Sequence, residues 1–90
     1  MRADYSPAAE RDLEQAIDNL LLVSTKAAAD FGSLVDASVA AVLDFPELGR
    51  RSLRGRRVLV LGRSGYRLVY AIRGELIVIL RVENLRRAKR

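Results

Sequence analysis

The sequence contains no cysteine and no histidine. Without cysteine, the chain forms neither disulfides nor thiolate metal sites, which is typical of proteins in a reducing cytoplasm. Without histidine, it lacks the side chain best suited to proton transfer near neutral pH and the commonest metal ligand. These absences exclude zinc enzymes, Ser-His-Asp hydrolases and Cys-His enzymes. We therefore expect neither a bound metal nor a cofactor.

Long hydrophobic runs are also missing. The most apolar run covers only residues 76–80, which is too short to cross a bilayer. The first five residues have no apolar stretch of the kind found in a signal peptide. A chain of 90 residues has room for one thin core and no enclosed substrate cavity. We expect a single domain, 1–90, that is soluble, cytoplasmic and without a membrane partner.

Acidic residues are scarce in the second half of the chain. Residues 1–48 hold three basic and nine acidic residues, a net charge of −6, whereas residues 49–90 hold thirteen basic and two acidic residues, a net charge of +11. The overall net charge of +5 hides this division. The basic half predicts an arginine-rich surface that attracts polyanions or acidic protein segments.

The first half of the chain predicts two helices. Ser6 is suited to cap the first helix and Pro7 to its first position, and apolar residues then recur three and four apart as far as Leu21. Ser24 or Thr25 is suited to cap a second helix, which Pro46 ends because proline disfavours helix at the residue before it. The short link between the two predicts an antiparallel helical hairpin with an acidic outer surface.

The second half predicts strands. Apolar residues alternate over 56–61, 66–72 and 76–84, and the glycine-containing breaks between these segments have the length of hairpin turns. We expect an α+β fold in which the helical hairpin packs on one face of a three-strand antiparallel meander. Residues 2–5 are a candidate fourth strand at the edge. Residues 48–55 are interpreted as a loop, and its arginines Arg50, Arg51 and Arg54 either follow a phosphate backbone or, as is usual for a basic loop, are only solvated.

The spacing of apolar residues also predicts how the last hairpin pairs. A three-residue turn at 73–75 gives an entirely apolar face toward the helices, whereas a turn at 73–74 brings Arg81 onto that buried face. The three-residue turn places Arg67 opposite Arg81 on the other face. Ile77 and Ile79 are then predicted to lie beside Arg67, together with Val69 and Ala71.

Four segments, in order and at characteristic spacings, resemble the RelE/ParE superfamily of type II toxin–antitoxin systems. They are residues 5–13 (YSPAAERDL), 45–50 (FPELGR), 66–70 (YRLVY) and 79–87 (ILRVENLRR). The resemblance covers essentially the whole chain. It implies a small toxin, often linked to plasmid stabilisation, that forms a hetero-oligomer with a cognate antitoxin whose toxin-binding segment is acidic.

The resemblance leaves the target open, because ParE-like members poison DNA gyrase and RelE-like members cut mRNA on the ribosome. It implies target-binding roles for Arg67, Arg81, Arg86 and Arg87. For a ribonuclease, the candidate catalytic residues are Arg67, Glu83 and Arg86, with Glu83 either a base or the partner of a nearby arginine.

The residues favour a binding protein over an enzyme. Asn84 stands where many relatives carry a histidine, and no tyrosine follows it. Tyr66 and Tyr70 are expected in the core. A ParE-like gyrase inhibitor is therefore the first hypothesis. A RelE-like ribonuclease and a basic nucleic-acid-binding module without toxicity remain alternatives.

Overall fold

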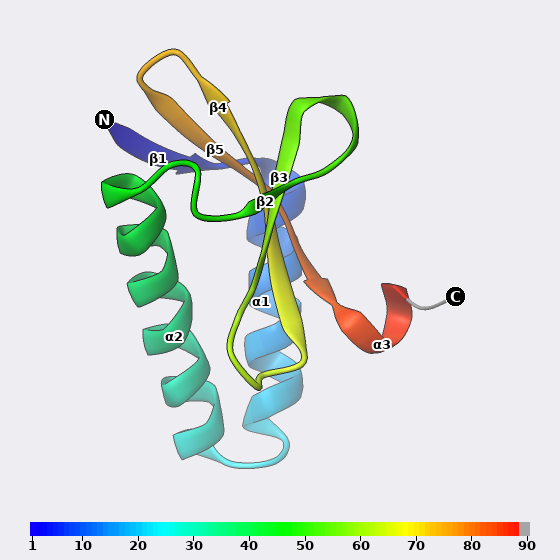
Figure 1. Ribbon diagram of the computed structural model, residues 1–90. Helices are drawn as coiled ribbons and strands as arrows, with labels where there is room; N and C mark the ends of the chain where they lie inside the picture. The colour runs from blue at the N-terminus through cyan, green and yellow to red at the C-terminus, as the bar shows by residue number, and fades with distance from the viewer. Residues whose placement is uncertain (89–90) are drawn as a thin grey trace.

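The structure, a computed structural model, describes residues 1–88 and has the predicted α+β architecture. Two long helices lie side by side against a twisted sheet, and residues 85–88, drawn in red, lie away from them (Figure 1). The elements are β1 (Arg2–Tyr5), α1 (Pro7–Leu21), α2 (Thr25–Asp44), β2 (Arg50–Arg51), the 3₁₀ turn η1 (Leu53–Gly55), β3 (Arg56–Val60), β4 (Tyr66–Arg73), β5 (Leu76–Asn84) and α3 (Leu85–Ala88). In the described residues, no helix is long and apolar enough to span a bilayer.

Both long helices begin at the predicted caps. The Ser6 hydroxyl accepts a hydrogen bond from the Ala9 N–H at 3.0 Å, and the Ser24 hydroxyl accepts one from the Ala27 N–H at 2.9 Å. Each bond satisfies a donor that the first turn of a helix leaves free. The second helix ends at Asp44, just before the Phe45-Pro46 pair, as proline requires.

The sheet has five strands in the order β1-β5-β4-β3-β2. The candidate edge strand at 2–5 is confirmed, and it pairs with β5 in parallel, so the sheet is mixed rather than wholly antiparallel. The two-residue strand β2 lies within the segment predicted to be a loop and pairs antiparallel with β3. Short elements such as β2 and α3 carry too few residues to show a periodic pattern.

The predicted turn between β4 and β5 is wrong. Arg73 pairs with Leu76, so the turn consists of Gly74 and Glu75 rather than three residues. Gly74 has a φ of 62°, which glycine adopts without steric cost. Shortening the turn by one residue shifts the pairing of the two strands, and a shift of one residue moves every following side chain to the opposite face.

A β-bulge halfway along β5 shifts the pairing by one further residue and so returns the following side chains to their predicted faces. Ile79 pairs with Tyr70 and Arg81 pairs with Val69, so Leu80 is an extra residue without a partner on β4. Beyond the bulge, Val82 returns to the helix-facing side while the charged Arg81 stays off it. The bulge therefore keeps Arg81 off the buried face, although the turn has only two residues.

The corrected register changes the neighbours of Arg67. This residue lies opposite Glu83, not opposite Arg81 as predicted. Ile77 and Ile79, which were predicted to lie beside it, are instead fully buried in the core under the helices. The like-charge pair inferred from the sequence therefore does not exist.

The core lies between the helices and one face of the sheet. It joins apolar side chains of α1 and α2 to those of β4 and β5 and to Leu61, which follows β3: Ala9, Ala16, Phe31, Val35, Val42, Leu61, Leu68, Tyr70, Ile77, Ile79 and Val82. Tyr70 is fully buried there, as predicted, whereas Tyr66 packs against the edge of the core with its ring 4.8 Å from that of Phe31.

The opposite side of the sheet, called here the open face, is turned away from the helices. Strand register places these side chains on it: Arg2, Asp4, Arg50, Arg56, Val58, Val60, Arg67, Val69, Ala71, Arg73, Leu76, Val78, Arg81 and Glu83. Val58, Val69 and Ala71 are buried at its centre although they are not part of the main core. The open face is thus mainly a rim of arginines around a small apolar centre.

Tyr70 fixes the connection between α2 and β2. Its hydroxyl accepts a hydrogen bond from the Gly49 N–H at 2.8 Å and donates one to the Pro46 carbonyl at 2.8 Å. A Cβ on Gly49 would lie 2.8 Å from the Tyr70 ring and 3.0 Å from the Val58 carbonyl oxygen, so only glycine fits there without a shift. The 45–50 and 66–70 segments are therefore structural partners.

Candidate target-binding surface

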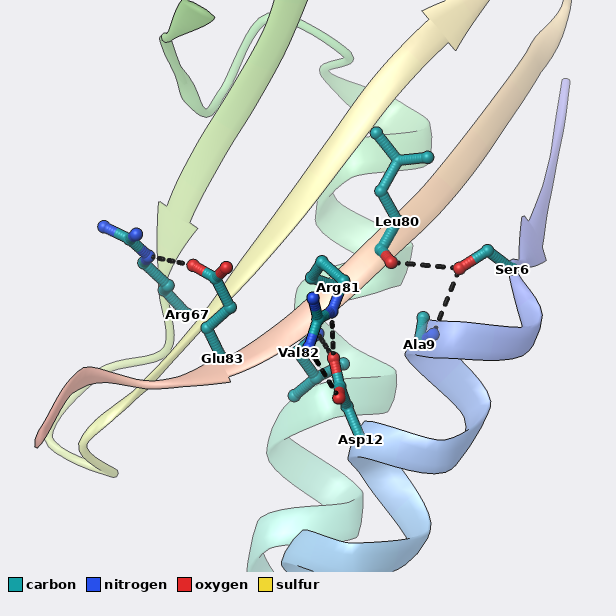
Figure 2. Close-up of polar contacts among 8 residues, drawn as sticks. All are labelled: Ser6, Ala9, Asp12, Arg67, Leu80, Arg81, Val82 and Glu83. Carbon is teal, nitrogen blue, oxygen red and sulfur yellow. Dashed lines mark hydrogen bonds and ion pairs between the residues drawn. The ribbon is translucent and has the colours of Figure 1, made fainter. Parts of the chain in front are cut away.

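The end of β5 is joined to the start of α1 by side-chain hydrogen bonds. The strand β1 stops at Tyr5, so the backbone of β5 has no neighbouring strand on that side beyond Ile79. Ser6 supplies the hydrogen bonds that a neighbouring strand would otherwise supply. Its N–H donates to the Ile79 carbonyl and its hydroxyl donates to the Leu80 carbonyl, both at 2.9 Å. Figure 2 shows Ser6 bridging Leu80 and Ala9. Ser6 thus caps α1 and also hydrogen-bonds to Leu80, the extra residue of the bulge.

Asp12, one helical turn and a half further along α1, continues this connection. Its carboxylate accepts hydrogen bonds from the Val82 N–H at 3.0 Å and from the Arg81 guanidinium at 2.7 and 3.1 Å (Figure 2). Burial alone raises the pKa of Asp12, but the bonds from Arg81 and Val82 outweigh it and hold that pKa below its ordinary value. The same pair raises the pKa of Arg81. Arg81 thus links β5 to α1 and has a structural role.

Arg67 and Glu83 form an ion pair on the open face. The Arg67 Nε lies 2.8 Å from Glu83 Oε1, and each side chain is 28% exposed (Figure 2). The pair joins directly opposite residues of β4 and β5, so it supports the strand register as well as neutralising both charges. Partial exposure leaves the guanidinium open to a partner on one side.

A pocket of about 240 Å³ lies between α1 and the far end of β5. Its walls combine Gln15 and Asn19 from α1 with Tyr66, Glu83 and Asn84 from the strand ends, along with the Asp12–Arg81 pair. The Asn84 side chain accepts a hydrogen bond from the Arg86 N–H at 2.9 Å and so starts α3. The pocket is polar, small and bounded by side chains that already serve the fold.

The arrangement suits binding better than proton transfer. General acid–base catalysis needs a titratable group near the reaction pH and free to reach its substrate. Glu83 is held by Arg67 and Asp12 by Arg81, and the low pKa of Asp12 keeps that carboxylate ionised at neutral pH. Arginine stays protonated, so it supplies charge and hydrogen bonds rather than protons.

A family model described as "ParE toxin of type II toxin-antitoxin system, parDE" matches residues 3–88. The chain belongs to this ParE toxin family. The structure titled "Chromosomal ParDE TA system from P. aeruginosa" has a similar fold, with a TM-score of 0.81 and 21% sequence identity over 94% of this chain and 96% of the other. At that identity the likeness shows the fold alone. A comparison with curated proteins gave no match.

Within the ParE fold, the four arginines predicted to bind the target do not form one cluster. Arg67 lies on the open face, Arg81 reaches from the edge of β5 to α1, and Arg86 is exposed on α3. The side chain of Arg87 lies outside the described part of the structure. Glu83 is the partner of Arg67, one of the two roles considered for it.

The prediction of a loop at residues 48–55 missed an organised basic hairpin. The strands β2 and β3 pair there, with Arg50 opposite Val58 and Arg51 opposite Arg57. The Arg57 guanidinium donates to the Gly49 carbonyl at 2.8 Å and ties the hairpin to the Tyr70 contact. The many arginines of this segment are evident in the sequence. Their number does not indicate that the backbone carrying them is paired in a sheet.

Proposed function

We propose that this chain is the toxin of a type II module that acts in the cytoplasm by binding and inhibiting DNA gyrase. A cognate antitoxin with an acidic toxin-binding segment neutralises it by forming a hetero-oligomer. The match to the ParE family over residues 3–88 carries this proposal. The geometry supports it because the carboxylates near the end of β5 are bound to arginines rather than free for catalysis.

The surface proposed for gyrase combines Arg67 on the open face with Arg86 on α3 and the half-exposed Val60. Val60, Arg67 and Glu83 lie opposite one another at one end of the sheet, on the side of the C-terminal half of α1. Charged rims of this kind set association rate and selectivity, while apolar contacts supply most of the affinity.

The test is a gyrase supercoiling assay with the purified chain, with and without ATP, scored for inhibition and for cleaved plasmid trapped on the enzyme. We expect both effects. A folded sample that leaves supercoiling and cleavage unchanged at saturating concentration would refute gyrase as the target.

Arg67→Ala is the first variant for this assay. It should retain the fold, because the side chain lies off the core, and reduce inhibition on the order of tenfold, as expected for one interfacial arginine. Arg63→Ala is the matched control, since Arg63 is an exposed arginine in the turn after β3. Circular dichroism of both variants separates a lost contact from lost folding. Equal inhibition by the two variants would remove Arg67 from the target surface.

A second candidate, ribosome-dependent mRNA cleavage, is favoured by one observation. Tyr66 lines the same pocket as Arg81 and Glu83, so a tyrosine, a guanidinium and a carboxylate share one site. Primer extension on a translated message, with wild type and Tyr66→Phe, tests this function. Cleavage that the phenylalanine variant loses would favour the ribonuclease over the gyrase inhibitor.

A further inference from the structure

Residues 50–56 form a basic hairpin, called here the arginine arm. It contains β2, η1 and the start of β3, and in Figure 1 it projects from the sheet on the side away from α2. Arg50, Arg51, Arg54 and Arg56 are all exposed, and none of them forms an ion pair within residues 1–88. The sequence has no acidic residue between Glu47 and Glu75. The arm is therefore a local concentration of uncompensated positive charge.

The tip of the arm has a defined conformation. Arg54 and Gly55 are consecutive residues with positive φ values of 60° and 70°, and the Ser52 N–H donates to the Arg56 carbonyl at 2.8 Å across the turn. An arginine rarely adopts positive φ, so Arg54 holds a backbone conformation that its residue type disfavours. The turn carries Leu53, whose exposed fraction of 81% makes it an isolated apolar side chain at the tip.

We propose that the arginine arm binds duplex DNA. Guanidinium groups bind phosphate oxygens through paired hydrogen bonds, which lysine cannot match, and all of the basic residues in the arm are arginines. An arm that combines arginines with one projecting apolar residue has the chemistry of minor-groove binders, in which the apolar side chain contacts sugars or enters a base step. In the arginine arm, Leu53 is the apolar residue with this role.

An acidic protein segment fits the arm less well than DNA does. Protein interfaces gain most of their affinity from a central cluster of buried apolar and aromatic side chains. Leu53 is the one apolar side chain among residues 50–56, so a protein partner would find charge but little apolar area. Phosphate contacts need no such area, because counterion release supplies the affinity.

This inference goes beyond the proposed gyrase function and does not depend on it. The arm is formed by β2, η1 and the start of β3, whereas the proposed gyrase surface centres on the Arg67–Glu83 pair of β4 and β5. DNA binding is measured without gyrase, so a failure of either proposal leaves the other testable.

The experiment is fluorescence anisotropy of a short labelled duplex titrated with the purified chain at several salt concentrations. The variant R50Q/R51Q/R54N removes three charges from the arm, with asparagine at position 54 because it tolerates positive φ. We expect the dependence of log K on log salt to fall by roughly three, one for each lost phosphate contact. Leu53→Ser should weaken binding about three- to tenfold without changing that slope.

The matched control is R11Q/R63Q/R73Q, which removes the same charge from three exposed arginines outside the arm. We expect it to change affinity less than about threefold, since only the general field is reduced. Equal losses in both triple variants, or no binding by the wild type, would overturn the proposal. Tighter binding of labelled polyglutamate than of DNA would assign the arm to an acidic protein instead.

A readout on the unmodified chain guards against a variant that fails to fold. Amide chemical shifts of the wild type, recorded by NMR during titration with the same duplex, should move for residues 50–56. Shifts confined to other parts of the sheet would contradict the proposal whatever the behaviour of the variants.

Discussion

Tyr70 shows how much one side chain contributes at the residue scale. Its buried hydroxyl satisfies the Gly49 N–H and the Pro46 carbonyl. Tyr70→Phe leaves both groups without that partner, so we expect it to lower the free energy of unfolding by about 1–3 kcal/mol, measured by urea denaturation. Tyr66→Phe is the control, since its hydroxyl forms no hydrogen bond within the described residues, and it should stay within about 0.5 kcal/mol. Equal losses would contradict this role.

Single residues were predictable from the sequence where their role is local. The caps Ser6 and Ser24 and the buried position of Tyr70 follow from neighbouring residues and periodicity. The partner of Arg81 was not predictable, because Asp12 lies 69 positions away in the chain. Such a pairing depends on the packing of α1 against β5, which no local pattern encodes.

At the scale of elements, α1 and β5 depend on each other through Asp12. The folded pKa of this carboxyl lies below its unfolded value, so its contribution is fully present above the unfolded pKa and is lost as pH falls through the folded pKa. Asp12→Asn should lower the free energy of unfolding by about 1 kcal/mol at neutral pH, a modest figure because Arg81 is half-exposed. The difference from the wild type should vanish in acid.

Urea denaturation at a series of pH values from neutral to acid checks this dependence. Asp18→Asn, a change of an exposed carboxyl on the same helix, is the control and should remain within about 0.5 kcal/mol at every pH. A constant gap between wild type and Asp12→Asn down to the lowest pH would show that the ionised carboxylate contributes nothing.

Element order and bounds were largely predictable, but pairing was not. Capping residues and proline identified the two long helices, and alternation identified the three central strands, whereas glycine located the last turn without giving its length. The Leu80 bulge was hidden because a leucine is compatible with either face of a strand. That single extra residue decides that Arg67 faces Glu83, so the predicted site inherited the error in register.

At the scale of the whole molecule, the division of charge between the two halves controls how fast the chain associates with a charged partner. The −6 first half and +11 second half give the chain a strong dipole, with the positive charge concentrated over the sheet. We expect association with the acidic antitoxin segment proposed above to slow by roughly tenfold as salt rises from low to physiological concentration, with little change in dissociation. Stopped-flow fluorescence measures both rate constants. An association rate insensitive to salt would exclude electrostatic steering.

The parallel pairing of β1 with β5 has a consequence for the order in which the sheet is completed. Residues 2–5 hydrogen-bond with residues 76–79, so β1 can take its place in the sheet only after β5 has been synthesised. Contacts between such distant segments form slowly, since a long loop must close first. We therefore expect the docking of β1 on β5 to be a late step of folding, after the two helices and the β3–β4 and β4–β5 hairpins have formed.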